Sequence, residues 1–224
     1  MSELKPISLY TSATPNGRKI SIALEELGLE YNVRNIDLGN NEQKEDWFLS
    51  INPNGRIPAI IDHTAGDLTI FESGAILIYL AEKTGRLLPT NPAKRYAVMQ
   101  WLFFQMSGLG PMQGQANVFY RYMENNVPEA TLRYQIETLR LYGVWDQQLE
   151  QQPYIAGEFS IADIAAYPWI KIAGWAGFST EAFPNIERWI TELDSRPSFQ
   201  RGLRVPDNMK KEDLLKAGMD MLVK

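Results

Sequence analysis

The chain of 224 residues contains no cysteine and a single histidine, His63. Without cysteine it can form no disulfide, no Cys-ligated zinc site and no iron–sulfur cluster, and it has no thiolate nucleophile of its own. One histidine excludes a His-rich metal site and leaves a single imidazole that could serve as a base. Any redox chemistry based on sulfur must therefore take its sulfur from a ligand.

Long hydrophobic runs and an excess of positive charge are also missing. No stretch of about 18 apolar residues occurs, so we expect no transmembrane helix. The first six residues lack the apolar core of a signal peptide. The 22 Lys and Arg residues against 27 Asp and Glu residues give a net charge of −5, which argues against a general nucleic-acid binder. We expect a cytoplasmic protein that binds neither nucleic acid nor membrane.

Strand and helix signals alternate over the first 85 or so residues. The apolar residues Ile20, Ala23, Leu24 and Leu27 follow the i, i+3, i+4, i+7 pattern of one helix face, and Gly28 is placed to end that helix. The predicted order is β-α-β-α-β-β-α. We expect the strands on either side of each helix to be parallel and the last two strands to form a hairpin. The predicted strands are 7–10, 31–36, 57–61 and 68–71, and the predicted helices are 16–27, 43–49 and 73–82.

Only helical signals follow a linker over residues 87–92. Gly108, Gly110 and Pro111 should bend or interrupt the first long helix. Residues 160–163 fit a capping box with Asp163 in place of the usual Glu. We therefore predict two domains, an α/β domain over 1–86 and an all-helical domain over 91–224. The predicted helices of the second domain are 93–106, 129–150, one from 160 that contains Pro168, 184–195 and a loose helix over 213–222.

A Glu-Ser pair, Glu72 and Ser73, opens the last helix of the α/β domain. A helix N-terminus has unpaired N–H groups and a partial positive charge, so it suits a carboxylate. Glu72 offers a negative partner for an ammonium group, and the pair would therefore match an α-amino-acid head. The alternative is that Ser73 only caps the helix, since serine is a preferred N-cap residue.

Two further polar clusters carry open alternatives. A cis Ile57-Pro58 bond would turn the backbone outward, so that the N–H and C=O groups of Ile57 could pair with a peptide ligand; the sequence does not decide between cis and trans. Thr14 before Pro15 fits a helix cap followed by the first helical residue. In a functional interpretation, Thr14 and Asn16 would donate hydrogen bonds to a thiolate.

These motifs, in their order and spacing, resemble the cytosolic glutathione transferases over nearly the whole chain, to about residue 204. The resemblance rests on residues 54–58, on Glu72-Ser73 and on residues 160–163. The chain is most similar to the nu class and to the related fungal nitrogen-catabolite-regulator-like class. That closer likeness rests on residues 14–17, 71–77, 100–103 and 108–112.

The resemblance implies an N-terminal thioredoxin-like domain that binds glutathione, followed by an all-helical domain with an acceptor-substrate pocket. It implies that Thr14 and Asn16 contact the glutathione sulfur, in place of the catalytic Tyr, Ser or Cys of other classes. It further implies that Gln43 meets the glycyl end, that Arg56 and Ile57 flank the cysteinyl part, that Glu72 and Ser73 hold the γ-glutamyl head, and that Arg133 approaches the neighbouring subunit's site.

The implied activity is glutathione-dependent thiol:disulfide exchange by a homodimer, with one or two glutathione molecules per site, no metal, and weaker transferase and peroxidase activity. Conjugation of glutathione to small electrophiles is the first alternative. The second is a non-catalytic glutathione-binding regulator. In the fungal relatives regulation goes with additional N-terminal sequence, whereas the fold predicted here starts within about ten residues of Met1.

Other residues compete for these roles. Tyr10 and Ser12 lie where other classes keep their catalytic residue, but the Thr-Pro-Asn motif favours Thr14 and Asn16 and makes Tyr10 structural. We expect His63 to be a surface turn residue, because no carboxylate–nucleophile pair is recognisable around it. Aromatic residues of the helical domain could line an acceptor pocket, although most aromatics at helical spacing are core or interface. These are Trp101, Phe103, Phe104, Phe119, Tyr120, Tyr122 and Trp169.

Overall fold

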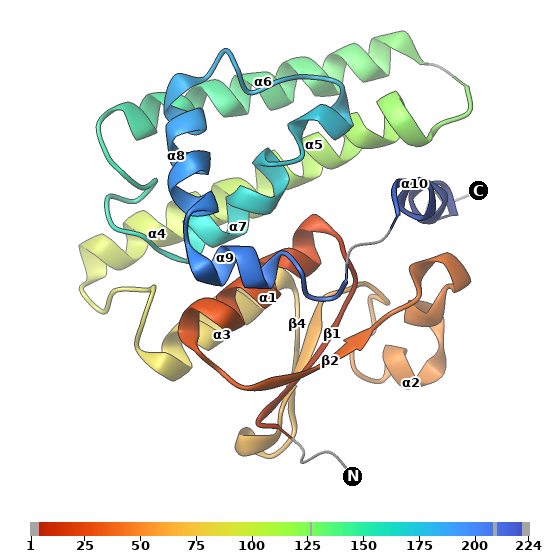
Figure 1. The fold of residues 1–224 in the computed structure, drawn as a ribbon, viewed down its shortest axis with the longest axis vertical. Coiled ribbons are helices and arrows are strands. Elements are labelled where there is room, and N and C mark those ends of the chain that lie inside the picture. The colour runs from red at the N-terminus through yellow and green to blue at the C-terminus, as the bar shows by residue number, and fades with distance from the viewer. Residues whose placement is uncertain (1–4, 126, 208–209, 221–224) are drawn as a thin grey trace. The chain divides into compact units, whose positions relative to one another are not determined.

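The computed structural model describes residues 5–125, 127–207 and 210–220 (Figure 1). The chain forms two compact units. The first is built from two separate stretches, the chain up to Arg86 and the segment that begins at Arg196, and the second comprises Leu87–Ser195. Among the described residues, every helix is too short or too polar to cross a membrane.

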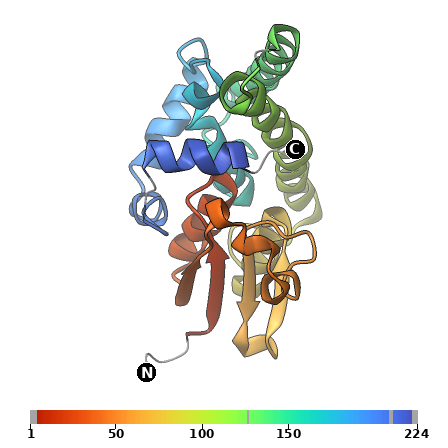
Figure 2. The same cartoon turned by 90° about the vertical axis from the view of Figure 1, so that its right-hand side faces the viewer.

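A four-stranded mixed sheet forms the centre of the first unit, with strand order β2-β1-β3-β4 (Figures 1 and 2). The strands are β1 (Ile7–Thr11), β2 (Tyr31–Asn35), β3 (Ala59–Asp62) and β4 (Leu68–Phe71). β1 runs parallel to β2 and antiparallel to β3, and β3 and β4 form an antiparallel pair. The predicted order β-α-β-α-β-β-α and the closing hairpin are confirmed.

One expected strand direction is wrong. β3 is antiparallel to β1 and therefore to β2, although a helix lies between β2 and β3 in the sequence. A parallel connection must carry the chain back along a full strand length, about 13 Å for four residues. The helix α2 (Asp46–Leu49) has four residues and spans only about 6 Å. The rest of the connection contains two short 3₁₀ turns, Leu38–Asn40 and Glu42–Lys44, so β3 starts at the edge where β1 ends.

Two helices, α1 (Pro15–Leu27) and α3 (Ser73–Thr84), pack against each other and cover the sheet. The alternation of burial along β1 puts Ile7 and Leu9 on its buried face. α1 contributes fully buried apolar side chains such as Ile20 and Leu24. As predicted, α1 ends at Gly28, which adopts the left-handed conformation at φ 68°.

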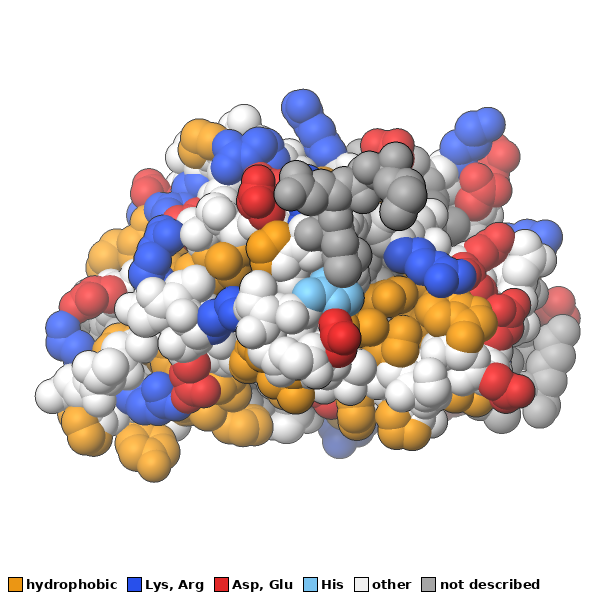
Figure 3. Space-filling model, turned by 90° about the horizontal axis from the view of Figure 1, so that it is seen from below, with side chains coloured by type: hydrophobic (Ala, Val, Ile, Leu, Met, Phe, Trp, Pro, Cys, Tyr) orange, Lys and Arg blue, Asp and Glu red, His pale blue; other side chains and the backbone are white. Residues whose placement is uncertain are grey.

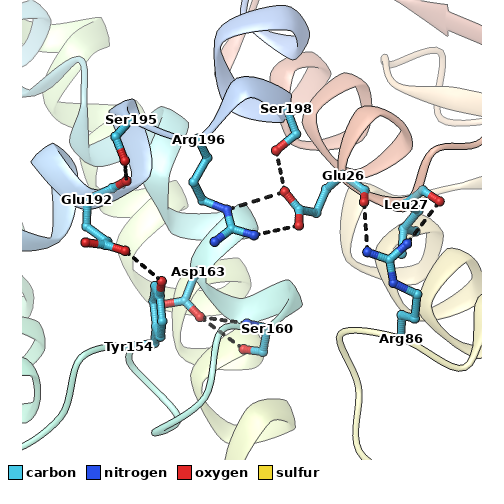
Figure 4. Close-up of polar contacts among 10 residues, drawn as sticks. All are labelled: Glu26, Leu27, Arg86, Tyr154, Ser160, Asp163, Glu192, Ser195, Arg196 and Ser198. Carbon is cyan, nitrogen blue, oxygen red and sulfur yellow. Dashed lines mark hydrogen bonds and ion pairs between the residues drawn. The ribbon is translucent and has the colours of Figure 1, made fainter.

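The segment from Arg196 returns to the first unit. Its short helix α9 (Pro197–Gly202) lies so close to α1 that a Cβ atom on Gly202 would be 2.6 Å from the Cα of Ile22. The carboxylate of Glu26 on α1 accepts hydrogen bonds from Arg196, at 2.6 Å, and from Ser198 (Figure 4). The last helix, α10 (Lys211–Asp220), was expected over 213–222; Leu222 lies outside the described residues.

The second unit is helical, as predicted. The long helix expected to break near Gly108 does so at a π-helical turn over Gln105–Leu109. The capping box is confirmed: the Ser160 side chain accepts the backbone N–H of Asp163, the third helical residue, and the Asp163 carboxylate accepts the Ser160 N–H. The second of these bonds, at 3.0 Å, is drawn in Figure 4. The helices are α4 (Pro92–Phe104), α5 (Gly110–Asn117), α6 (Pro128–Glu150), α7 (Ile161–Ile170) and α8 (Pro184–Asp194), with a second π-helical turn over Val118–Tyr122.

Candidate functional site

The strand register brings the three polar clusters to one edge of the sheet. Tyr10, near the end of β1, is opposite Ala59 at the start of β3, and Ala59 is opposite Phe71 at the end of β4. The segment that follows β1, the segment that precedes β3 and the residues that follow β4 therefore meet at the same edge. This edge is the candidate site.

Thr14 is the N-cap of α1, and its hydroxyl oxygen accepts the N–H of Gly17 at 3.2 Å. Pro15 is the first helical residue, so the capping interpretation is confirmed. Capping uses a lone pair of the hydroxyl oxygen and leaves its proton for donation. Gly17 is required here because a Cβ atom would be 2.2 Å from the carbonyl oxygen of Ser12. Thr14 can therefore cap the helix and donate a hydrogen bond at the same time.

The other candidates near the end of β1 differ in exposure and contacts. Asn16 is the second residue of α1 and, like Thr14, is half-buried. Ser12 is buried, and its carbonyl accepts the Thr14 N–H at 2.7 Å. The Tyr10 ring packs against Trp47 with a centroid distance of 6.1 Å, within an apolar cluster beside α2. These contacts support a structural role for Tyr10.

At the third cluster, Glu72 occupies the N-cap position of α3 and Ser73 is the first helical residue. The interpretation that Ser73 caps the helix is therefore wrong. Glu72 has φ 69° and ψ 115°, a backbone conformation that is strained for a residue with a side chain, and its side chain makes no cap hydrogen bond. The first turn of α3 thus has no side-chain cap, while the Glu72 carboxylate is exposed beside it.

Sequence reasoning missed Lys19, which lies beneath this helix end. Its side chain is buried, with 1% exposure, and its Nζ is 3.4 Å from the Ser73 hydroxyl oxygen. Burial lowers the pKa of Lys19 to about 7, and the negative charge of Glu72 opposes part of that shift. A signal was present in the helical pattern: Lys19 is four residues before Ala23 and shares its face of the helix.

Gln43 lies in the turn before α2 and is buried, with 4% exposure. Its Nε2 donates to the Asn41 Oδ1 at 3.4 Å, whereas its Oε1 has no hydrogen-bond partner among the described residues. A buried acceptor of this kind is costly unless a ligand or water supplies a donor.

The segment before β3 holds Arg56 and Ile57. The Ile57-Pro58 bond is cis, which decides the alternative that the sequence left open. Ile57 is half-buried and Arg56 is exposed. The Arg56 carbonyl accepts the side-chain amide of Asn52 at 2.6 Å, which ties this segment together.

Arg133 belongs to the second unit, where it is exposed on α6. Its positive charge helps to lower the pKa of Glu137, although the larger effect comes from the hydrogen bond of Arg140. Within the described ranges, no group of three or more His, Cys, Asp and Glu side chains could hold a metal ion.

His63 lies in the expected turn, but the absence of a carboxylate–nucleophile pair was a wrong expectation. Its Nδ1 is 2.5 Å from Asp67 Oδ1, and its Nε2 is 2.9 Å from the Ser8 hydroxyl. Figure 3 shows the single histidine, in pale blue, at the surface. The Asp67 side chain is 75% exposed, so it lacks the buried, fixed position that orients the imidazole in a hydrolytic triad.

Known family models match both parts of the chain. The N-terminal domain of glutathione S-transferase matches residues 5–82, and the C-terminal domain of glutathione S-transferase matches residues 111–197. The chain is 45% identical over 202 residues to the disulfide-bond oxidoreductase YfcG of Escherichia coli, covering 88% of this chain and 94% of that protein. It is 33% identical to the protein URE2 of Eremothecium gossypii, with 89% and 69% covered.

Solved structures are similar over most of the chain. A glutathione transferase from Burkholderia graminis, with two glutathione molecules bound per subunit, has 42% identity and a TM-score of 0.86, covering 92% of this chain and 90% of that one. One from Pseudomonas putida, with one glutathione disulfide per subunit, has 41% identity and a TM-score of 0.86, with 92% and 94% covered. The mixed sheet with its helices, followed by a helical unit, is the arrangement of this fold. The protein belongs to the glutathione S-transferase family.

Proposed function

We propose that this protein binds glutathione at the sheet edge described above and catalyses glutathione-dependent reduction of disulfides, with weaker transferase and peroxidase activity. One observation carries the proposal: a chain without cysteine places the hydroxyl of Thr14, its proton still available, at the edge where the uncapped end of α3 lies. Two relatives support the same reaction: one is a disulfide-bond oxidoreductase, and the other is a solved glutathione transferase structure with glutathione disulfide bound.

Each candidate residue has a proposed part. Thr14 and Asn16 donate to the sulfur, and the orphaned Oε1 of Gln43 accepts from the glycyl end. The exposed Arg56 and the half-buried Ile57, whose backbone follows from the cis Ile57-Pro58 bond, hold the cysteinyl part. Glu72 and Ser73 hold the γ-glutamyl head, and Arg133 contributes to the site of a neighbouring subunit.

The reaction is an exchange between sulfur atoms that all belong to ligands. A glutathione thiolate attacks one sulfur of the substrate disulfide, the S–S bond breaks, and the departing thiolate takes up a proton. A second glutathione thiolate then attacks the mixed disulfide and releases glutathione disulfide and the second thiol. The protein supplies alignment of the reacting sulfurs and hydrogen-bond donors to the attacking thiolate. Neutral donors lower the thiol pKa less than a nearby cation does.

We further propose that the protein acts as a cytoplasmic homodimer. The support is a set of large apolar side chains that a lone subunit leaves in water. On α4 and α6 these are Tyr96, Phe103, Leu132 and Ile136, exposed by 67%, 56%, 57% and 55%.

The proposed function is tested by comparing two reactions of the purified protein. One is the reduction of 2-hydroxyethyl disulfide by glutathione, and the other is the conjugation of glutathione to 1-chloro-2,4-dinitrobenzene. Efficient reduction with weak conjugation is expected. The reverse ratio would support a conjugating transferase and contradict the proposal. Binding of glutathione with neither reaction would support a non-catalytic regulator, and failure to bind glutathione would contradict all three functions.

A further inference from the structure

Arg34, near the end of β2, makes two contacts for which the roles proposed above leave no use. Its guanidinium carbon lies 3.7 Å from the centre of the Trp47 ring, and its Nη2 donates to Glu42 Oε1 at 2.9 Å. The Arg34 side chain is 53% exposed, and an ion pair at such a position adds little to the stability of a fold. Arg34 nevertheless joins β2 to both sides of the turn Glu42–Lys44, because Glu42 opens this turn and Trp47 follows it on α2.

The Glu42 carboxylate links Arg34 to the backbone of the connection between β2 and α2. Its Oε1 accepts from Arg34, while its Oε2 accepts the N–H of Asp37 at 2.8 Å. The Glu42 N–H donates in turn to the Asp37 carbonyl at 3.1 Å. On the other side of the turn, the Trp47 ring N–H donates to the Glu45 carboxylate at 2.6 Å. The position of the turn therefore depends on a guanidinium that stacks on an aromatic ring and donates to a carboxylate at the same time.

Gln43 lies between these two contacts. Its side chain is buried, and its Oε1 is the acceptor that has no hydrogen-bond partner among the described residues. Its backbone is closely packed, because a Cβ atom on Gly55 would be 2.8 Å from the Gln43 carbonyl oxygen. Gly55 immediately precedes Arg56 and Ile57, the residues proposed above for the cysteinyl part. A shift of the turn would therefore move the Gln43 acceptor relative to those residues.

We propose that Arg34 is a positioning residue for Gln43, and that the acceptor it positions makes the site select glutathione over γ-glutamylcysteine. This inference rests on the proposed function. Glutathione presents an amide N–H at its glycyl residue, which is a donor that matches Oε1. γ-Glutamylcysteine has a carboxylate at the same place, so it leaves the buried acceptor unpaired and brings a second acceptor toward it. In this role Arg34 acts through Glu42 and Trp47 rather than on the ligand.

The test is isothermal titration of the purified protein with two ligands whose sulfur cannot react, S-methylglutathione and S-methyl-γ-glutamylcysteine. The wild type should bind the first about tenfold more tightly than the second. Arg34→Met removes the guanidinium and should weaken the binding of S-methylglutathione about 3- to 10-fold, with the binding of S-methyl-γ-glutamylcysteine unchanged. Arg34→Lys, which keeps a cation beside Glu42 but loses the planar stack, should have a ratio of affinities between those of the wild type and Arg34→Met.

Two comparisons separate this role from a general effect on the fold. Gln43→Ala should lose the selectivity, and Arg34→Met added to Gln43→Ala should not change the ratio of affinities further. The control variant is Arg201→Met on α9, which breaks an ion pair with Glu25 of nearly the same exposure: 57% and 20%, against 53% and 20% for Arg34 and Glu42. This variant should bind both ligands like the wild type.

An unchanged ratio of affinities in Arg34→Met, or an equal loss for both ligands, overturns the role of Arg34. If Arg34→Met fails to fold, Glu42→Gln removes the charge that Arg34 pairs with and should reduce the ratio in the same direction; an unchanged ratio there overturns the proposal. Wild-type protein that binds both ligands equally tightly also overturns it. Wild-type protein that binds neither ligand overturns the proposed function instead.

Discussion

At the scale of single residues, the Thr14 hydroxyl caps α1 and is also the group that we propose donates to the glutathione sulfur. Its oxygen accepts the Gly17 N–H and so caps α1. This bond does not use the hydroxyl proton, which can still be donated to another group. A capping interpretation and a catalytic interpretation of the same motif are therefore compatible, and the two roles can be separated by substitution.

Thr14→Gly should keep most of the stability and lose most of the activity. Glycine is tolerated at N-cap positions at a loss of a few tenths of a kcal/mol, but it has no hydroxyl to donate. A lost hydrogen bond to a charged sulfur should lower kcat/KM for disulfide reduction about 10- to 100-fold. Thr14→Ser should retain both properties, and Tyr10→Phe should leave the rate unchanged. Equal rates for Thr14→Gly and the wild type would show that the hydroxyl does not act on the sulfur.

Asp62, at the end of β3, should make the free energy of unfolding depend on pH in the acidic range. It has 0% side-chain exposure and accepts hydrogen bonds from Lys83, Thr64 and Tyr79. Burial tends to raise the pKa of Asp62, but the hydrogen bond from Lys83 and those of the other two donors outweigh burial and hold the pKa well below its usual range. Because the folded-state pKa is the lower one, this stabilisation is present above about pH 4 and is lost as the pH falls.

The measurement is urea unfolding of the wild type and of Asp62→Asn at pH 7 and pH 3. At pH 7 the variant should be less stable by about 1.5–3 kcal/mol, because a charged acceptor is replaced by a neutral one. The difference in the free energy of unfolding between the wild type and the variant should be smaller at pH 3. A difference of the same size at both pH values would mean that the charge of Asp62 does not contribute to stability.

At the scale of elements, the contact between α1 and α9 holds the returning segment on the first unit. Gly202→Ala should destabilise the protein by about 1–3 kcal/mol, since the new Cβ atom would be 2.6 Å from the backbone of Ile22 and neither helix can yield easily. Thermal unfolding checks this. A matched control is Gly143→Ala in the middle of α6, where an added Cβ atom would meet no described atom of another element within 4 Å and alanine should stabilise by about 0.5–1 kcal/mol. Equal effects of the two substitutions would contradict the close packing.

Sequence signals predicted helices well where capping residues mark the ends of the helix. α1 begins at Thr14-Pro15 and ends at Gly28, and the capping box starts α7 as expected. The predicted direction of β3 was wrong, because this direction depends on whether the segment that contains α2 is long enough to return the chain along a full strand length. The six-residue α9 was missed because it is too short to show a helical period. The candidate site residues were predicted from motifs. Lys19 was missed although it shares the helix face of Ala23, because a lysine at such a position is ordinarily exposed.

At the scale of the whole molecule, the absence of cysteine limits the sulfur chemistry of this protein to reactions between sulfur atoms of bound ligands. The chain belongs to the glutathione S-transferase family, and under the proposed function every reacting sulfur comes from a ligand. Under the proposed function, the contribution of the protein is the sheet edge, the two helix ends, and the hydroxyl and amide donors of Thr14 and Asn16. Reagents that modify thiols should therefore leave the protein itself untouched.

The most direct measurement is the rate at which glutathione reduces 2-hydroxyethyl disulfide in the presence of protein that has first been treated with iodoacetamide and freed of the reagent. We expect a rate well above that of glutathione alone and equal to the rate with untreated protein. A rate no higher than that of glutathione alone, with either protein sample, would contradict the proposed function.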